Sequence, residues 1–206
     1  MFKLLGTEYG GWPVDLGLVP ENSTVISAGV GEDISFDLEL IKNKSCNIVG
    51  VDPTEKSAVY IRKNPNDNFK FIQKALYSNS NQKVKMYKNQ NPQWVSESIT
   101  PTHNMVSDLD CYDATTVSVQ DLLKEYNNVS ILKMDIEGSE YEVLNNLKEL
   151  TIPQLCVEFH HFCTEYTIED TKKCIKHLMS LGYSNFVPKE NSKLLAELTF
   201  VHDCAL

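Results

Sequence analysis

Residues 131–140, Ile-Leu-Lys-Met-Asp-Ile-Glu-Gly-Ser-Glu, constrain this chain more than any other stretch. They predict a short buried strand that stops, turns at a glycine and enters a helix. Lys133 and Asp135 are two residues apart and share one face of that strand, which Glu137 joins if the chain stays extended. Burying ions is costly unless they are paired, so packing alone does not explain these charges. They indicate either a Lys–Asp pair that ties the strand to its neighbour, or the rim of an active site at the carboxyl end of a parallel sheet.

The helix after this strand has its own start signal. Ser139 is a natural N-cap, and Glu142 three residues later completes an S-x-x-E capping box. Tyr141, Leu144 and Leu147 repeat at helical spacing. The stretch therefore predicts a strand, a glycine turn and a capped helix in direct succession.

A second unit of strand, glycine turn and helix lies near the N-terminus. Residues 24–29 are rich in β-branched residues and end in the small residues Ala28 and Gly29. Val30 and Gly31 continue the turn before a helical pattern begins. Glycines at such a turn let backbone N–H groups approach a ligand closely. These four residues are therefore candidates for cofactor binding.

An acidic residue follows the next predicted strand, residues 46–51. Asp52 and Pro53 stand at its tip, and an acid about 20 residues after such glycines binds ribose hydroxyls in nucleotide-binding folds. The pair also suits a plain turn. We predict that Gly29 and Gly31 lie against a nucleotide-type cofactor. Asp52 would accept hydrogen bonds from the ribose hydroxyls of that cofactor.

Strands and helices alternate along most of the chain, which predicts a three-layer α/β domain with a mostly parallel sheet. No linker divides the 206 residues, so one domain, 1–206, is expected. The last two strands, joined by a polar turn, predict an antiparallel pair that closes the sheet. The further strands are predicted at 69–72, 83–87, 116–119, 155–159, 183–187 and 198–202, and the further helices at 54–63, 120–126 and 167–181.

Two segments lack a lasting periodic pattern. Residues 1–22 form a lead-in too rich in glycine for regular structure, with Trp12 packed on the core or beside a ligand. Residues 88–114 are polar and interrupted by prolines, which is typical of a functional or a disordered loop. We predict a lid on the substrate side, with Trp94 and Met105 folded inward.

The net charge of −9 argues against a nucleic-acid or anionic-membrane partner, whose phosphates require basic patches. No apolar run reaches transmembrane length, and the N-terminus lacks the apolar core of a signal peptide. The six cysteines are scattered without a C-x-x-C pair, which is typical of reduced thiols and predicts neither disulfides nor a zinc site. A cytoplasmic protein is therefore expected.

Several blocks resemble the FkbM-type S-adenosylmethionine-dependent methyltransferases, in order and spacing over roughly residues 24–160. The most specific is Lys-x-Asp-x-Glu-Gly-x-Glu, which begins at Lys133. The others are Val25-Ile-Ser-Ala-Gly-Val-Gly-Glu-Asp, Val51-Asp-Pro, Gln73-Lys-Ala-Leu-Tyr-Ser, Thr116-Val-Ser-Val-Gln-Asp-Leu-Leu and Cys156-Val-Glu-Phe-His.

The resemblance implies a Rossmann-like methyltransferase fold with seven strands and an antiparallel last strand. It also implies S-adenosyl-L-methionine as cofactor, methyl transfer to a hydroxyl of a sugar, glycan or small metabolite, and cofactor contacts from Lys74 and Ala75. Two positions depart from the pattern, because Ser27 replaces the usual acid of the glycine loop and Asp33 its third small residue. Glu32 and Asp33 therefore lie near the place where the carboxylate of the cofactor's amino-acid part is expected, which implies either that this part binds through its ammonium group or that cofactor binding is weak.

Methyl transfer to a hydroxyl requires a base, for which Asp135, Glu137 and His160 are candidates at the ends of neighbouring strands. We expect them to converge within a few ångströms, with Lys133 holding Asp135 or Glu158 in place. Histidine has a suitable ordinary pKa, whereas a carboxylate needs the help of burial. These acids and the histidine are also ligand types for a divalent metal ion, but their spacing establishes no metal site.

Two other functions stay open. A nicotinamide-dependent oxidoreductase uses a similar fold, but the third glycine of G-x-G-x-x-G is absent and no Tyr-x-x-x-Lys occurs. A degenerate domain that binds the cofactor, or only a partner protein, without catalysis would also be consistent with the altered glycine loop.

Overall fold

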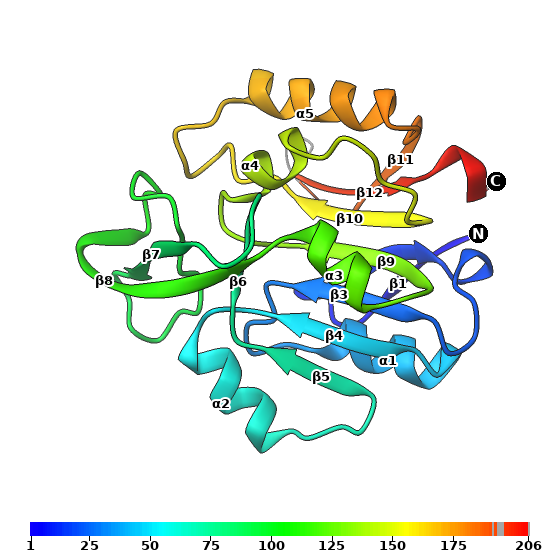
Figure 1. Ribbon diagram of the computed structural model, residues 1–206, viewed down its shortest axis with the longest axis horizontal. Coiled ribbons are helices and arrows are strands. Elements are labelled where there is room, and N and C mark those ends of the chain that lie inside the picture. The colour runs from blue at the N-terminus through cyan, green and yellow to red at the C-terminus, as the bar shows by residue number, and fades with distance from the viewer. Residues whose placement is uncertain (191, 193–195, 206) are drawn as a thin grey trace.

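The computed structural model describes residues 1–190, 192 and 196–205. At its centre is a seven-stranded sheet with the order β11-β12-β10-β9-β3-β4-β5 (Figure 1). The strands are β3 (Thr24–Ala28), β4 (Asn47–Val51), β5 (Phe69–Ile72), β9 (Val129–Met134), β10 (Gln154–Glu158), β11 (Asn185–Pro188) and β12 (Glu197–Val201).

The sheet is mixed, so the expectation of a mostly parallel sheet was too strong. Strands β10, β9, β3, β4 and β5 pair in parallel, whereas β12 runs antiparallel to both β10 and β11. The predicted seven strands and antiparallel last strand are confirmed. Part of the turn predicted between β11 and β12, at residues 191 and 193–195, lies outside the described residues.

Alternate residues of the central strands pack against different layers, as the period of a strand requires. Ile26, Leu132 and Val157 pack in the larger core with residues of α3, α4 and α5. Val25 and Ile131 pack in the second core with α1, α2 and the N-terminal segment. The bounds are α1 (Ser35–Lys44), α2 (Glu55–Lys63), α3 (Val119–Glu125), α4 (Glu140–Asn145) and α5 (Ile168–Ser180).

The N-terminal segment is more regular than the sequence predicted. Strands β1 (Phe2–Leu5) and β2 (Trp12–Asp15) form an antiparallel hairpin, followed by the short helix η1 (Leu16–Leu18). The glycines lie in the turn of the hairpin, so they connect two strands and do not prevent them. Trp12 packs in the second core with 2% of its surface exposed, as one of the two interpretations predicted.

The segment 88–114 was wrongly predicted as one long loop. Strand β7 (Lys83–Asn89) pairs with β8 (Val106–Val117), so only residues 90–105 are irregular. With β6 (Ala75–Leu76) these strands form a separate three-stranded sheet, which projects beside the main sheet at the left of Figure 1. Cross-strand backbone pairing holds β8 in place, and its exposed middle needs no apolar periodicity.

The capping residues in the local sequence explain where α2 and α5 begin, but not where α4 begins. Thr54 caps α2, and Thr167 with Asp170 forms a complete capping box on α5. Ser139 adopts a helical conformation and its side chain makes no cap bond, so the capping box predicted for α4 is wrong. Glu142 instead accepts hydrogen bonds from Ser78 and Asn146.

Within the described part of the chain, no helix combines the length and apolar character needed to cross a bilayer. The six cysteines are free, in agreement with the prediction of reduced thiols.

Candidate active site

The connection from β9 to α4 positions three of the predicted site residues. Glu137 has a φ of 54°, an uncommon left-handed conformation for a residue with a side chain, and Gly138 follows with a φ of 106°. The backbone oxygen of Glu137 accepts a 2.5 Å hydrogen bond from Ser98 in the irregular segment. The turn thus directs the Glu137 carboxylate back over the end of β9, where Asp135 lies. Left-handed residues of this kind cluster at functional sites.

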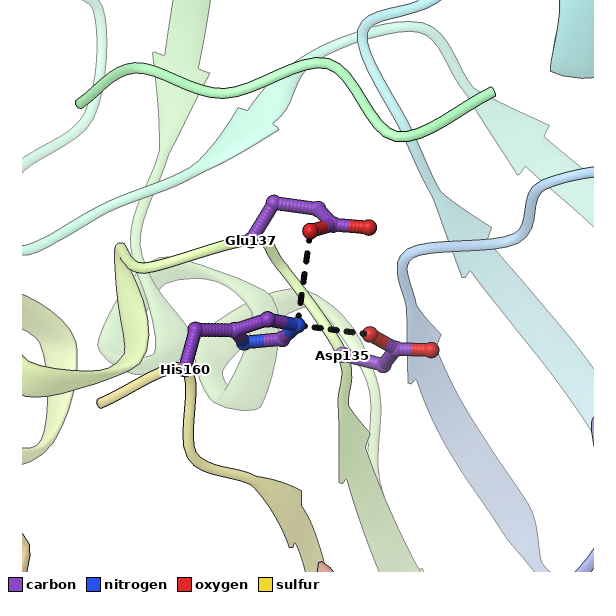
Figure 2. A group of neighbouring side chains, drawn as sticks. All are labelled: Asp135, Glu137 and His160. Carbon is purple, nitrogen blue, oxygen red and sulfur yellow. Dashed lines mark ion pairs between the residues drawn. The ribbon is translucent and has the colours of Figure 1, made fainter. Parts of the chain in front are cut away.

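Asp135, Glu137 and His160 converge as predicted. One ligand atom from each lies within 4.8 Å of the others. The Nε2 atom of His160 is 3.4 Å from Glu137 Oε2 and 3.7 Å from Asp135 Oδ1, and Figure 2 shows it pointing between the two carboxylates. Parallel pairing of β9 with β10 brings the two strand ends to one edge, so residues far apart in sequence meet.

Glu140 fixes the orientation of His160 and was missed as a site residue. Its side chain is fully buried, and Oε1 lies 3.1 Å from His160 Nδ1 and accepts a 2.7 Å bond from the His160 backbone. Its other oxygen accepts from the Gly138 backbone at 2.9 Å. The signal in the sequence is the last acid of the Lys-x-Asp-x-Glu-Gly-x-Glu block, but an acid in the first turn of a helix is also explained by the helix dipole.

A second histidine, His103, also joins the site without having been predicted. Its Nδ1 accepts from the backbone N–H of Met105 at 3.3 Å, so Nε2 carries the proton and donates to Glu137 Oε2 at 3.0 Å. Cys163 Sγ lies 3.2 Å from the same nitrogen. A buried histidine in a polar segment was the available signal, but its distance of 34 residues from Glu137 concealed the contact.

Electrostatics distinguish the carboxylates of the site. Desolvation raises the pKa of Asp135, against the attraction of Lys133 and His160. Desolvation would also raise the pKa of Glu137, but the His103 bond and nearby His160 outweigh it and the pKa is lowered. Burial, reinforced by Asp135, raises the pKa of Glu158 to about 8. Asp135 and Glu158 are therefore the stronger bases of this group.

His160 itself responds to the carboxylates around it. Desolvation lowers its pKa, but the charges of Glu140, Glu137 and Glu158 dominate and raise that pKa well above its usual range. These carboxylates therefore favour the protonated form of His160.

Lys133 is 7% exposed and joins two parts of the site. Its Nζ donates a 2.5 Å hydrogen bond to the Gly29 backbone oxygen and lies 3.8 Å from Asp135 Oδ2. Asp135 and Glu158 were the two expected partners of Lys133. Lys133 lies beside Asp135, whereas Glu158 lies beside His160, with its Oε1 atom 3.9 Å from His160 Nε2. Lys133 therefore links the glycine turn after β3 to the carboxylate after β9.

The glycine turn requires glycine at one position. Gly29 has a φ of 76°, and a Cβ atom there would lie 1.7 Å from the Asp135 backbone oxygen. This close approach lets the ends of β3 and β9 share one edge of the cavity. Ala28 is fully buried and accepts a bond from the Asp135 backbone at 3.1 Å. It therefore supports the turn and does not line the cavity.

Asp52 is engaged differently from the prediction. Its Oδ2 accepts from the backbone N–H groups of Val30 and Gly31 at 2.9 and 3.1 Å, and its Oδ1 accepts twice from Thr54. These four bonds fill the usual capacity of a carboxylate. A ribose hydroxyl would have to replace the bonds to the glycine turn, so this contact stays a prediction.

Asp33 ties the N-terminal hairpin to α1. Its carboxylate accepts from Thr7 Oγ1 at 2.6 Å and from the Ser35 backbone at 2.8 Å. Desolvation opposes ionisation, but these bonds prevail and the pKa of Asp33 is lowered. Asp33 nevertheless lines the cavity, with its negative charge beside the glycine turn.

Two adjoining cavities lie at this edge of the sheet. The larger has a volume of about 890 Å³ and is lined by the glycine turn, Asp52, Pro53 and Ala75, which are among the residues predicted to bind the cofactor. Lys74 does not line it. The smaller, of about 370 Å³, is lined by Glu158, His160 and Lys189 among others. Six residues line both cavities: Tyr9, Gly10, Ser96, Met105, Asp135 and Glu137.

A family model for the methyltransferase FkbM domain matches residues 19–184. The chain belongs to the FkbM methyltransferase domain family. Among curated proteins, no match to the sequence was found.

Two solved structures resemble the FkbM domain weakly. They are mutant forms of the 16S rRNA (adenine(1408)-N(1))-methyltransferase from Catenulisporales acidiphilia, 13% and 12% identical to this chain, each with a TM-score of 0.41. The matches cover 97% and 98% of this chain and 98% of each of those chains. A TM-score this low assigns neither a fold nor a substrate.

The larger cavity of the FkbM domain is strongly acidic. Among the residues that the structure describes, six carboxylates and one lysine line it: Glu32, Asp33, Asp52, Glu97, Asp135, Glu137 and Lys133. In the confined space of a cavity such an imbalance favours a cationic ligand and disfavours a polyanion.

The irregular segment 90–105 of the FkbM domain forms one wall of the larger cavity. Met105 and Trp94 both line it, but 52% of the Trp94 surface is exposed, so Trp94 is not folded inward as predicted. Lys56 of α2 donates hydrogen bonds to the backbone oxygens of Pro92 and Trp94 and holds the segment at this place. Whether the segment moves on ligand binding remains a prediction.

Proposed function

We propose that this FkbM domain transfers a methyl group from S-adenosyl-L-methionine to a hydroxyl of a sugar, glycan or small metabolite. The observation that carries the proposal is the charge of the larger cavity, with six carboxylates against one lysine. The methyl donor brings a positive sulfonium and an ammonium group, which such a cavity attracts. A nicotinamide dinucleotide brings a negative pyrophosphate, which the same carboxylates repel.

The lining residues also suit the other parts of this cofactor. A volume of about 890 Å³ lies in the range of ligand pockets, about 300–1,000 Å³. Gly29 and Gly31 let the backbone approach the ribose and methionine parts, and Val51 and Leu76 offer apolar contacts for a purine ring. Asp33 would face the ammonium group. When bound, the cofactor supplies an activated methyl group on a positively charged sulfur.

The acceptor would occupy the smaller cavity, because Asp135 and Glu137 line both spaces. We assign the role of general base to Asp135, which desolvation makes a stronger base and which Lys133 orients. Glu137 is held by His103 and lines both cavities, where it would help to position the acceptor. Asp135 would accept the proton that the acceptor hydroxyl releases when the methyl group passes from the cofactor's sulfur to the hydroxyl oxygen.

Ligand thermal shifts test the choice of cofactor. S-adenosylmethionine and its demethylated product should each raise the melting temperature, because a ligand at 100 times its dissociation constant stabilises a protein by about 2.7 kcal/mol. NAD should produce no shift. A shift with NAD alone would instead support the oxidoreductase interpretation.

Incubation with a labelled methyl donor and a panel of glycans and metabolites tests the chemistry. Once an acceptor is found, Asp135→Asn should lower turnover by about 100-fold or more with little change in cofactor affinity. Asp108→Asn makes the same change at an exposed position of β8 and serves as the control. Cofactor binding without transfer to any acceptor would indicate the binding domain without catalysis.

A further inference from the structure

The site contains a ring of ligand atoms with space between them. His160 Nε2 is 3.4 Å from Glu137 Oε2 and 3.7 Å from Asp135 Oδ1, and none of these separations is a hydrogen bond. Around a divalent ion with bonds of about 2.1–2.3 Å, neighbouring ligand atoms stand about 3 Å apart and opposite ones about 4.5 Å apart. The 4.8 Å span of the three residues is close to that size.

The imidazole of His160 is prepared to act as a ligand. Glu140 engages Nδ1 on one side and, with its second oxygen, the Gly138 backbone. Carboxylates in this arrangement commonly orient metal-binding histidines. Among the described residues Nε2 makes no hydrogen bond, although only 3% of His160 is exposed, and it points at the gap between the carboxylates (Figure 2).

The excess of carboxylates at the site also favours binding of a further cation. Four carboxylates, from Asp135, Glu137, Glu140 and Glu158, lie within 4 Å of the His160 ring nitrogens. Lys133 is 3.8 Å from one of them, and a protonated His160 would add a single further positive charge. Buried carboxylates without paired charge are costly, so a divalent ion at the centre would stabilise this arrangement.

We infer that Asp135, Glu137 and His160 bind a divalent cation of the Mg²⁺ or Mn²⁺ class. Two carboxylate oxygens and one imidazole nitrogen make a mainly oxygen ligand set, which favours these ions over thiolate-seeking ones. Three protein ligands leave positions open toward the smaller cavity. The binding site itself does not depend on the proposed function.

A role in catalysis does rest on the proposed function. An ion at this place would bind the acceptor hydroxyl and lower its pKa, which eases proton removal. Asp135 would offer one carboxylate oxygen to the ion and keep the other for the proton. The smaller cavity would then select acceptors with a hydroxyl that can reach the ion.

Calorimetric titration of the full chain with MnCl₂, without donor or acceptor, tests ion binding directly. The wild type should bind one ion per chain. Glu137→Gln and Asp135→Asn should weaken binding by at least about tenfold, and Glu140→Gln by about 10–100-fold through His160. Glu169→Gln, an exposed acid of α5 paired with Lys172, should bind Mn²⁺ like the wild type. Circular dichroism shows whether each variant is folded.

Paramagnetic broadening by Mn²⁺ of the His160 ring signals gives a second measurement that does not depend on any variant. Absence of binding by the folded wild type, or equal binding by the Glu137→Gln and control proteins, would overturn the inference. Mn²⁺ binding at the site without methyl transfer would leave the ion site standing and count against the proposed function. Methyl transfer that persists in the presence of a chelator, in a protein that binds no Mn²⁺, would overturn the ion site and leave the proposed function standing.

Discussion

Asp37 lies on the buried face of α1 with only 3% of its surface exposed, and its Oδ1 atom has no hydrogen-bond partner among the residues that the structure describes. Desolvation raises its pKa from 3.8 to about 6, against the attraction of Lys133 and a bond from Ser27. The folded state therefore holds this proton more tightly than the unfolded state does. The stability that Asp37 contributes is present below about pH 4 and is lost as the pH rises through about 6.

The size of the effect follows from the two pKa values. Each pH unit between 3.8 and about 6 corresponds to about 1.4 kcal/mol of unfolding free energy for one proton. Ionised Asp37 therefore costs the folded state about 3 kcal/mol at neutral pH. Asparagine has nearly the same shape and stays neutral. We predict that Asp37→Asn changes stability little near pH 4 and stabilises the protein by up to about 3 kcal/mol near pH 8.

Urea unfolding followed by tryptophan fluorescence, at a series of pH values between about 4 and 8, measures this difference. Asp67→Asn removes a carboxylate at an exposed position and should give a curve parallel to that of the wild type. The reasoning is refuted if the stability gained by Asp37→Asn does not grow between about pH 5 and 8. A constant difference would mean that Asp37 keeps its ordinary pKa in the folded state.

Three further predictions concern ligands. Asp52→Ala should weaken binding of S-adenosylmethionine by about 2 kcal/mol, the scale of bonds to a charged acceptor; unchanged affinity in calorimetry would contradict this role. Hydrogen exchange of residues 90–105 should slow when acceptor and demethylated cofactor are bound together, because the segment then closes over both. Equal protection of these residues in the free and the bound protein, together with full activity after deletion of the segment, would exclude a lid. In the donor-label assay, a phosphorylated form of an accepted substrate should be methylated more slowly than the neutral form, since Glu8 and Glu190 line the smaller cavity; equal rates would show that these charges do not select the acceptor.

The sequence by itself determined the local structure around the site. Short runs of apolar and β-branched residues located β3, β4, β9 and β10, and glycines marked the turns that follow β3 and β9. These signals are local, because a strand buried on both faces must be apolar and a sharp turn requires a left-handed residue. Charges at the end of an apolar strand were similarly informative, since burial without a partner is costly. They identified Asp135 and Glu137, and parallel pairing of the strands then placed His160 beside them.

Only the tertiary structure decided which residues complete the site. His103 reaches Glu137 across 34 residues, and Glu140 turns from the start of its helix to His160. A strand was predicted at 83–87, but most of β8 escaped prediction because an exposed strand can be held by cross-strand backbone bonds that leave no apolar pattern. Ser139 shows the reverse case, in which a good local capping signal gives way to a turn set by contacts of Glu137 and Gly138. Contacts between distant segments depend on how the strands are ordered in the sheet, and no window of sequence contains that order.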